Sequence, residues 1–333
     1  VDFDDATKFY NVSTVNYLAA GACQYSDSGV TIWPLDQTVA DTQLYVRDVV
    51  IDYIKDKGTV SPQYEGRVRF LKAVALLHTN DFHGNLEPDS SGRGGSAYIA
   101  QQVNLIRNEY KAENVALLDG GDIFFGGAPI SALLMGEPAI DIYNRMGYVL
   151  SGIGNHEFDK GQAVLQERVD QADFPFVSAN IVVAGTDWDS PAWVKPYHIL
   201  TLGSGTSQVK IGVIGLTTDE TPNVTLRGTT DGIVFKDMTA AVLHYYDEVA
   251  AQADAVILLA HMGKDDSAGF KGMKTVAQEL IDAGKPVPLI ISGHAHEALE
   301  APVWVGHTAI VQANYAGRKL GRIDVVIDPW AKT

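Results

Sequence analysis

Short apolar runs rich in β-branched residues alternate with longer amphipathic stretches from about residue 71 onward. The runs have the length of strands that are buried on both faces. Two stretches between them, residues 96–110 and 238–251, carry apolar side chains at the three- and four-residue spacing of a helix with one buried stripe. This alternation is typical of helices that cover largely parallel sheets, so the pattern predicts an α/β fold. We expect strands at residues 74–77, 115–118, 148–153, 175–179, 211–216, 256–260 and 289–291, and closing strands at 303–311 and 321–327.

The first 70 residues have a different pattern. A helix is predicted at residues 42–57, where Asp41 can cap the first turn and Gly58 can end the last one. So short a segment can bury little apolar surface by itself. Alternating charges near residue 70 then give way to the first apolar run of the α/β region. We therefore expect a short α+β segment at residues 1–70 and an α/β domain at residues 71–333.

Composition and charge exclude several classes of protein. Of the 333 residues, 46% are hydrophobic and 20% are charged, as in ordinary globular proteins, and no apolar run approaches the roughly 20 residues of a membrane-spanning helix. The single cysteine, Cys23, excludes an internal disulfide and a cysteine-rich zinc module. The net charge of −16 argues against a nucleic-acid surface or an anionic membrane as partner. The first residues carry no initiator Met and no leader, so we expect a processed or excised chain.

Asp, Asn and His are concentrated in short blocks that directly follow predicted strands. In an open α/β fold, ligands gather outside the carboxyl ends of the strands, so residues far apart in the sequence can meet in one crevice. The sequence therefore predicts a single polar site made of distant segments. The five blocks are Asn-Asp-Phe-His-Gly at 80–84, Gly-Gly-Asp at 120–122, Gly-Asn-His-Glu at 154–157, Ala-His-Met-Gly at 260–263 and Gly-His-Ala-His at 293–296.

The residue types in these blocks favour a pair of metal ions. Asp81 and His83 are two residues apart, which places both on one side of an extended segment, and the same holds for His294 and His296. A carboxylate such as that of Asp122 can bridge two ions. Several imidazoles and no thiolate favour Zn, Mn or Fe over Ca or Mg. Two divalent ions and two aspartates would leave a local charge of about +2, which attracts phosphate despite the acidic chain.

Three segments carry a family resemblance: Leu-His-Thr-Asn-Asp-Phe-His-Gly-Asn at 77–85, Gly-Asn-His-Glu-Phe-Asp-Lys-Gly at 154–161, and Gly-Val-Ile-Gly-Leu-Thr-Thr at 212–218 with Glu-Thr-Pro at 220–222. With the five blocks in this order, residues 74–328 resemble the calcineurin-like metallophosphoesterase superfamily, and more narrowly its 5′-nucleotidase branch. The resemblance implies a four-layer α/β/β/α metallophosphoesterase sandwich.

The resemblance also implies roles for individual residues. His156 would stabilise the transition state or protonate the leaving oxygen, and Asp159 would orient it. Seven residues would hold two metal ions that share Asp122: Asp81, His83, Asp122 and His296 for one ion, and Asp122, Asn155, His261 and His294 for the other. The other histidines are expected at surface or core positions: His78, His198, His244 and His307.

As to function, the resemblance implies a secreted or periplasmic hydrolase that releases phosphate from nucleoside 5′-monophosphates with two divalent metal ions, Zn or Mn. A nucleotide phosphodiesterase or a nucleotide-sugar hydrolase could use the same site. A third possibility is a catalytically silent metal-binding module of a larger fused protein. The nucleobase, the metal and the oligomeric state stay open.

Residues 1–70 resemble the last part of the 5′-nucleotidase C-terminal, substrate-binding domain, which in the family follows the metal domain. The family's Gly-Gly-Asp-Gly-aromatic run is here Gly-Ala-Cys-Gln-Tyr at 21–25, and the resemblance places Tyr25 where an aromatic ring would stack on the base. Because the order of the two parts is reversed, we expect an excerpt of a tandem or fused polypeptide, with a rearranged order as the alternative.

Overall fold

The computed structural model describes residues 24–25, 30–31, 51–52, 55–56, 72–205 and 208–327. The chain divides into two units, Val1–Arg67 and Val68–Thr333. In the first unit, β1 (Gln24–Tyr25) pairs antiparallel with β2 (Val30–Thr31). Residues 51–52 and 55–56 are helical, and the rest of the helix predicted at 42–57 lies outside the described residues. The division into domains at residue 70 stays a prediction.

The second unit is built on two sheets. The five-stranded sheet has the order β15 (Gly321–Ile327), β3 (Lys72–Thr79), β4 (Val115–Asp119), β5 (Leu150–Gly152) and β6 (Phe176–Val177). The six-stranded sheet has the order β13 (Val303–Val305), β14 (Thr308–Val311), β12 (Leu289–Ser292), β11 (Ala255–His261), β9 (Val209–Thr217) and β8 (Tyr197–Leu202). Among these strands, β15, β8 and β13 run antiparallel to their neighbours and the other pairs are parallel.

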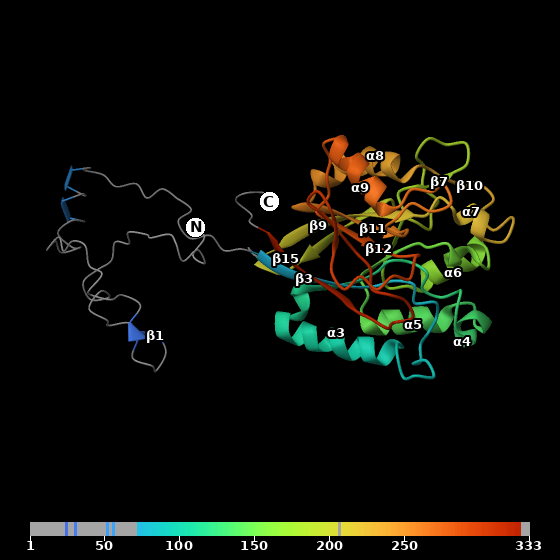
Figure 1. Cartoon of the computed structure of the whole chain (residues 1–333), viewed down its shortest axis with the longest axis horizontal. Helices are drawn as coiled ribbons and strands as arrows, with labels where there is room; N and C mark the ends of the chain where they lie inside the picture. Colours follow the sequence, from blue (N-terminus) through green and yellow to red (C-terminus); the bar gives the residue numbers. More distant parts are fainter. Residues whose placement is uncertain are drawn as a thin grey trace. The chain divides into compact units, whose positions relative to one another are not determined.

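Helices cover the outer face of each sheet, which gives the four layers of an α/β/β/α sandwich (Figure 1). The five-stranded sheet is covered by α3 (Ser96–Tyr110), α5 (Glu137–Met146) and α6 (Gln162–Gln171). The six-stranded sheet is covered by α8 (Met238–Ala250) and α9 (Met273–Asp282). The shorter elements are η2 (Ala112–Asn114), α4 (Pro129–Leu133), η3 (His156–Phe158), α7 (Thr221–Val224) and the antiparallel pair β7 (Ile181–Val183) and β10 (Ile233–Phe235).

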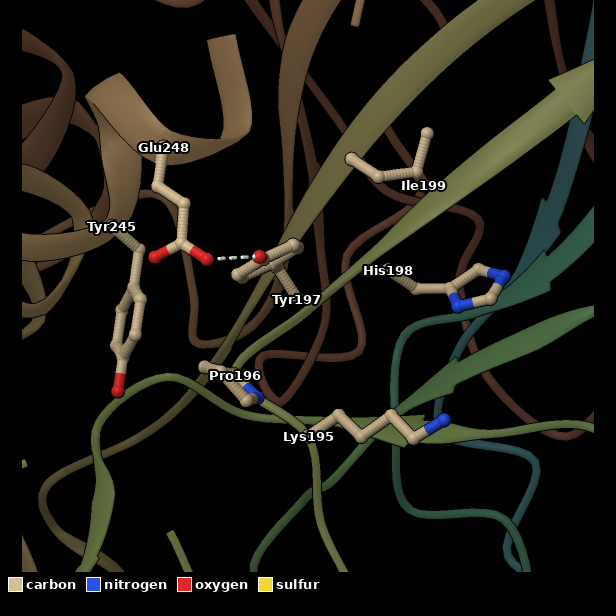
Figure 2. A pocket seen from close by; sticks show the side chains of 7 residues that line it. All are labelled: Lys195, Pro196, Tyr197, His198, Ile199, Tyr245 and Glu248. Atoms are coloured by element: carbon tan, nitrogen blue, oxygen red, sulfur yellow. Dashed lines mark hydrogen bonds between the residues drawn. The ribbon is translucent and has the colours of Figure 1, made fainter. Parts of the chain in front are cut away.

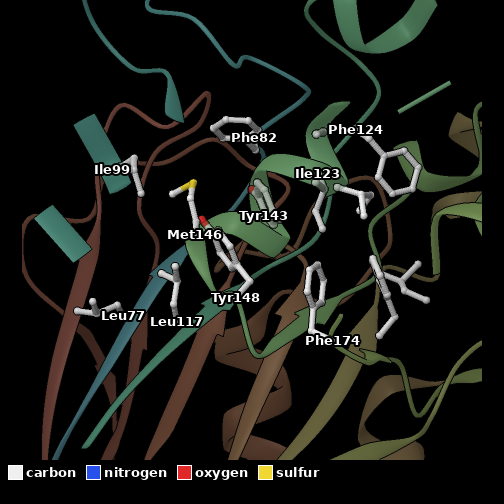
Figure 3. Packing of buried hydrophobic residues seen from close by; sticks show 14 of the residues in the cluster. Leu77, Phe82, Ile99, Leu117, Ile123, Phe124, Tyr143, Met146, Tyr148 and Phe174 are labelled. Atoms are coloured by element: carbon white, nitrogen blue, oxygen red, sulfur yellow. The ribbon is translucent and has the colours of Figure 1, made fainter. Parts of the chain in front are cut away.

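The inner strands are buried on both faces, as their apolar runs predict. Along β3, Leu76 faces the other sheet, in a cluster that includes Leu259 of β11. Its neighbour Leu77 faces the helices instead, in the cluster that contains Ile99 and Tyr143 (Figure 3). A strand buried on both faces has no room for solvated polar side chains along its length. The Asp, Asn and His side chains of the polar blocks therefore lie at the ends of the strands.

Two expectations need correction. The closing strand expected at residues 303–311 is a hairpin, because β13 and β14 pair antiparallel with Val305 opposite Thr308. The two residues between them include Gly306 at φ 56°, a left-handed conformation that suits a two-residue hairpin turn. The strands expected at 148–153 and 175–179 are shorter than their apolar runs, at three and two residues. Most of their remaining residues are buried in the adjoining loops, where Tyr148 and Ile153 pack in the cluster beneath the helices.

His78 makes the stability of this fold sensitive to acid. Its ring lies buried in β3, and Nδ1 has no hydrogen-bond partner among the described residues. Burial lowers the pKa of His78 from 6.5 to about 4. Between these values the unfolded chain binds a proton that the folded chain does not, so stability falls as the pH decreases. We expect a loss of about 2 kcal/mol from this group between pH 7.5 and pH 5.

The variant His78→Leu should lack this loss, because leucine does not ionise. Denaturant unfolding of both proteins at pH 7.5 and pH 5 measures the difference. An equal loss of stability in both would contradict the prediction.

Candidate metal centre

The five polar blocks all lie at the carboxyl ends of inner strands, and both sheets contribute. On the five-stranded sheet, the loop after β3 carries Asp81 and His83, and the loops after β4 and β5 carry Asp122 and Asn155. On the six-stranded sheet, β11 ends at His261, and the loop after β12 carries His294 and His296. The seven residues expected as ligands thus come from four loops and the end of one strand, and they meet at one end of the sandwich. The ligand atoms of the six Asp and His residues among them fall into compact groups of three, and within each group these atoms lie within 4.8 Å of one another.

The first group consists of Asp81, His83 and His296. The Nε2 atoms of His83 and His296 lie 2.9 Å apart, and Nε2 of His296 lies 3.4 Å from Oδ1 of Asp81. His83 is held from its other side, where Nδ1 lies 2.6 Å from the carbonyl oxygen of Phe125. Since Nδ1 then carries the proton, Nε2 presents a lone pair to the group.

The second group consists of Asp122, His261 and His294. Nε2 of His261 lies 3.0 Å from Oδ2 of Asp122, and Nδ1 of His294 lies 2.9 Å from Oδ1 of Asn155. The same Oδ2 of Asp122 is 4.0 Å from Nε2 of His83. The Asp122 carboxylate therefore lies between the two groups, where it can serve both.

The contacts of the His261 ring indicate whether these residues fit a metal ion. Its side chain is fully buried, and Nδ1 lies 2.8 Å from the carbonyl oxygen of Gly120. The opposite nitrogen, Nε2, faces Oδ2 of Asp122 at 3.0 Å and Oδ1 of Asp81 at 3.9 Å. Burial alone would lower the pKa of His261, but Asp122 and Asp81 raise it to about 10. Two carboxylates that raise the pKa of a buried imidazole favour a positive charge between them, and a metal ion can supply that charge in place of the proton, because imidazole nitrogens and carboxylate oxygens are donors for divalent metal ions.

The backbone is strained at most of these positions. Non-glycine residues rarely adopt a positive φ, and each instance costs about 1–3 kcal/mol. The loops hold the conformation by bonding to one another: the amides of Asp81 and His83 donate to the carbonyl oxygens of Gly121 and Asp122. Such strain is typical of functional sites, where it turns side chains toward a common point. The left-handed residues are Asp81 (52°), His83 (52°), Asp122 (60°), His294 (69°) and His296 (53°).

Glu157 is a site residue to which the sequence analysis gave no role. Its side chain is fully buried, and its two oxygens accept three backbone N–H groups, from Asp122 (2.8 Å), Ile123 (2.7 Å) and Gly154 (2.7 Å). The carboxylate thus ties the loop after β4 to the loop after β5. Its place in the Gly-Asn-His-Glu block is the only sequence signal for this function.

His156 and Asp159 form the pair that their spacing suggests. The turn η3 brings them together, and Nδ1 of His156 lies 2.8 Å from Oδ2 of Asp159. The hydrogen bond to Asp159 raises the pKa of His156 to about 9. The His156 side chain is 34% exposed, and its ring lies 5.1 Å from the ring of His83. Because Asp159 occupies Nδ1, Nε2 is the nitrogen of His156 that remains available at the edge of the two groups.

The remaining histidines lie elsewhere. His244 stacks on Trp188 at 4.5 Å, His307 is exposed in the turn after β13, and His198 borders a cavity of about 490 Å³ at the β8 edge of its sheet (Figure 2). None of the expected ligands lines that cavity. The side chain of Tyr25 lies outside the described residues, so its role in base stacking stays a prediction.

The sequence model of the calcineurin-like phosphoesterase family matches residues 74–298. The chain is 28% identical over 297 residues to the cell wall protein Lmo0130 of Listeria monocytogenes, covering 77% of this chain and 37% of that protein. It is 32% identical over 275 residues to the 5′-nucleotidase of Vibrio cholerae, covering 75% of this chain and 48% of that protein. The structure of a 5′-nucleotidase precursor from Thermus thermophilus superposes with a TM-score of 0.61 at 26% identity, covering 77% and 52%. The chain thus spans about half the length, or less, of these relatives.

Replacing Glu157 by Gln should destabilise the fold. Glutamine offers one acceptor oxygen instead of two, so at least one buried N–H loses its partner, which costs about 1–3 kcal/mol. Denaturant unfolding of the metal-free variant measures this cost. The matched control is Glu167→Gln on α6, an exposed glutamate whose replacement should change stability by less than about 0.5 kcal/mol. Equal stability of the two variants would mean that other contacts hold the loops.

Proposed function

Because this chain belongs to the calcineurin-like phosphoesterase family, we propose that it is a metal-dependent phosphoric ester hydrolase that releases phosphate from nucleoside 5′-monophosphates. The observation that carries the proposal is the position of the Asp122 carboxylate between two groups of imidazole and carboxylate ligands. The likeness to the Vibrio cholerae 5′-nucleotidase supports the choice of substrate class.

We assign the ligands as the two groups suggest. One divalent ion would be held by Asp81, His83, Asp122 and His296, and the other by Asp122, Asn155, His261 and His294. Zn and Mn are the ions that suit these nitrogen and oxygen donors. When bound, the pair supplies positive charge for the phosphate and Lewis-acid activation of the attacking and leaving oxygens.

His156 would act on the substrate itself. Asp159 fixes its ring through Nδ1, so Nε2 can hydrogen-bond to a phosphate oxygen or pass a proton to the leaving oxygen. Gly126 lies in the loop after β4, and its lack of a side chain lets this loop approach His156 closely. A Cβ at this position would lie 2.5 Å from Nδ1 of His83 and 3.0 Å from the His156 ring. The loop and the two rings thus bound the place where an ester would lie.

The variant Asp122→Ala should bind fewer divalent ions than the wild-type chain and should not release phosphate, because both groups lose their shared carboxylate. Elemental analysis of protein reconstituted with Zn or Mn gives the ion content, and phosphate release from AMP gives the activity. Full ion content in the variant would contradict the assignment of Asp122.

The variant His156→Asn should keep its ions but lose rate. General acid catalysis contributes about 10²- to 10⁴-fold, so kcat should fall within that range. The exposed His307→Asn is the matched control and should have wild-type kcat. Loss of ions in His156→Asn would instead make His156 a ligand, a possibility raised by its place in a third group with His83 and Asp122.

Two alternatives use the same residues. A nucleotide phosphodiesterase or a nucleotide-sugar hydrolase would prefer diesters or pyrophosphates, so rates on AMP, a dinucleotide and a nucleotide sugar distinguish them. A catalytically silent metal-binding module would bind ions and turn over none of the three.

We also propose that the protein works outside the cytoplasm. The name of the Listeria monocytogenes cell wall protein supports this location. Among the described residues, none of the helices combines the length and the apolar character that a bilayer crossing requires. We infer that the binding partner is a small nucleotide, which is also the substrate.

A further inference from the structure

His296 is the most exposed of the residues proposed as metal ligands. Its side chain is 41% exposed, whereas the side chains of His83 and Asp81 in the same group are 5% and 0% exposed. Burial therefore does not fix the plane of the His296 ring. A metal ligand must nevertheless present its nitrogen in a defined direction, so the orientation of this ring needs another source.

Tyr315 lies directly on this ring. The ring centroids of Tyr315 and His296 are 4.7 Å apart, and the planes differ by only 17°. Arg318 packs on the same tyrosine, with its guanidinium carbon 4.2 Å from the ring centroid, and Nη1 of Arg318 donates to the Tyr315 hydroxyl. Stacking contacts of this kind hold two rings parallel without requiring that either be buried.

Arg318 is itself anchored. Its Nη2 donates to Oδ2 of Asp89 at 3.0 Å. Oδ1 of Asp89 accepts the amides of Ser91 (2.8 Å) and Arg93 (3.1 Å), which fix the carboxylate within the loop before α3. A continuous series of contacts thus runs from this loop through Arg318 and Tyr315 to His296.

The backbone around Tyr315 is strained on both sides. Asn314 and Ala316 have φ values of 65° and 52°, in the left-handed region that non-glycine residues rarely adopt. The strain is held by the loop after β3: Ala316 donates its amide to the carbonyl oxygen of Asp81 at 2.8 Å, and Asn80 donates to the carbonyl oxygen of Asn314 at 2.5 Å. The same loop therefore sets the direction of Tyr315 and carries two proposed ligands, Asp81 and His83.

We propose that Tyr315 is a positioning residue that orients His296 toward the ion it would share with Asp81 and His83. The inference rests on the proposed metal site. Contacts that orient metal-bound histidines typically contribute 10- to 100-fold in metal affinity. The other ion would not depend on this stack, because the ring of His294 has a different neighbour: its Nε2 lies 3.5 Å from Oε2 of Glu220. Loss of Tyr315 should thus weaken the binding of one ion and leave the affinity for the other unchanged.

The test is a calorimetric titration of metal-free protein with Zn²⁺ or Mn²⁺. The variant Tyr315→Ala should bind one ion about 10- to 100-fold more weakly and the other unchanged. Tyr315→Phe keeps the ring and should restore both affinities to within a few-fold. The visible absorption of the Co²⁺-loaded protein should change in Tyr315→Ala and not in Tyr315→Phe.

Tyr110 provides a matched control. Arg322 packs on its ring at 4.8 Å and donates to its hydroxyl at 2.6 Å, so it repeats the tyrosine and arginine contact with no proposed ligand beside it. Tyr110→Ala should leave both metal affinities unchanged.

Equal affinities in wild type and Tyr315→Ala would overturn the inference and leave the proposed function intact. An equal loss in Tyr110→Ala would also overturn it. A wild-type chain that binds no ion would overturn both. If Tyr315→Ala does not fold, Arg318→Ala removes the anchor and keeps the tyrosine ring. Weaker binding of one ion by this variant would support the inference, and unchanged affinities for both ions would refute it.

Discussion

The Asp122 carboxylate is the point on which the site depends. It follows a strand of the five-stranded sheet, yet it lies 3.0 Å from Nε2 of His261, which ends a strand of the six-stranded sheet. The amide of Asp122 is fixed by Glu157, and its Oδ1 accepts the amide of His156 at 2.8 Å. One side chain therefore requires that two sheets, and the loops after β4 and β5, keep a single relative position.

Much of the fold could be predicted, because hydrophobic periodicity is strong where an element is long. The helix at 96–110 and the strand at 321–327 have the predicted bounds. The edge strand β8 was not predicted, since four of its six side chains are partly or fully exposed and no continuous apolar run marks it. Its pairing with β9 depends on tertiary contacts that a local pattern does not contain.

The candidate site was predictable in a different way. The blocks that carry Asp81, His83 and the other expected ligands form recognisable sequence motifs, and the sandwich brings them together. Glu157 and Tyr315 could not be given roles in the same manner. Glu157 acts on amides of two loops, and Tyr315 depends on left-handed residues on both sides of it. Such roles follow from where loops meet in space, and sequence spacing does not encode that.

The order of the ligands along the chain has a consequence for biosynthesis. Each of the two groups is completed by a histidine from the loop after β12, His296 in one and His294 in the other. A nascent chain that still holds this loop within the ribosome exit tunnel has Asp81 and Asp122 outside but neither group complete. On the proposed assignment, cation capture would therefore follow the emergence of this loop, and a polypeptide cut short before it would retain the acidic residues but lack the histidine that completes each group.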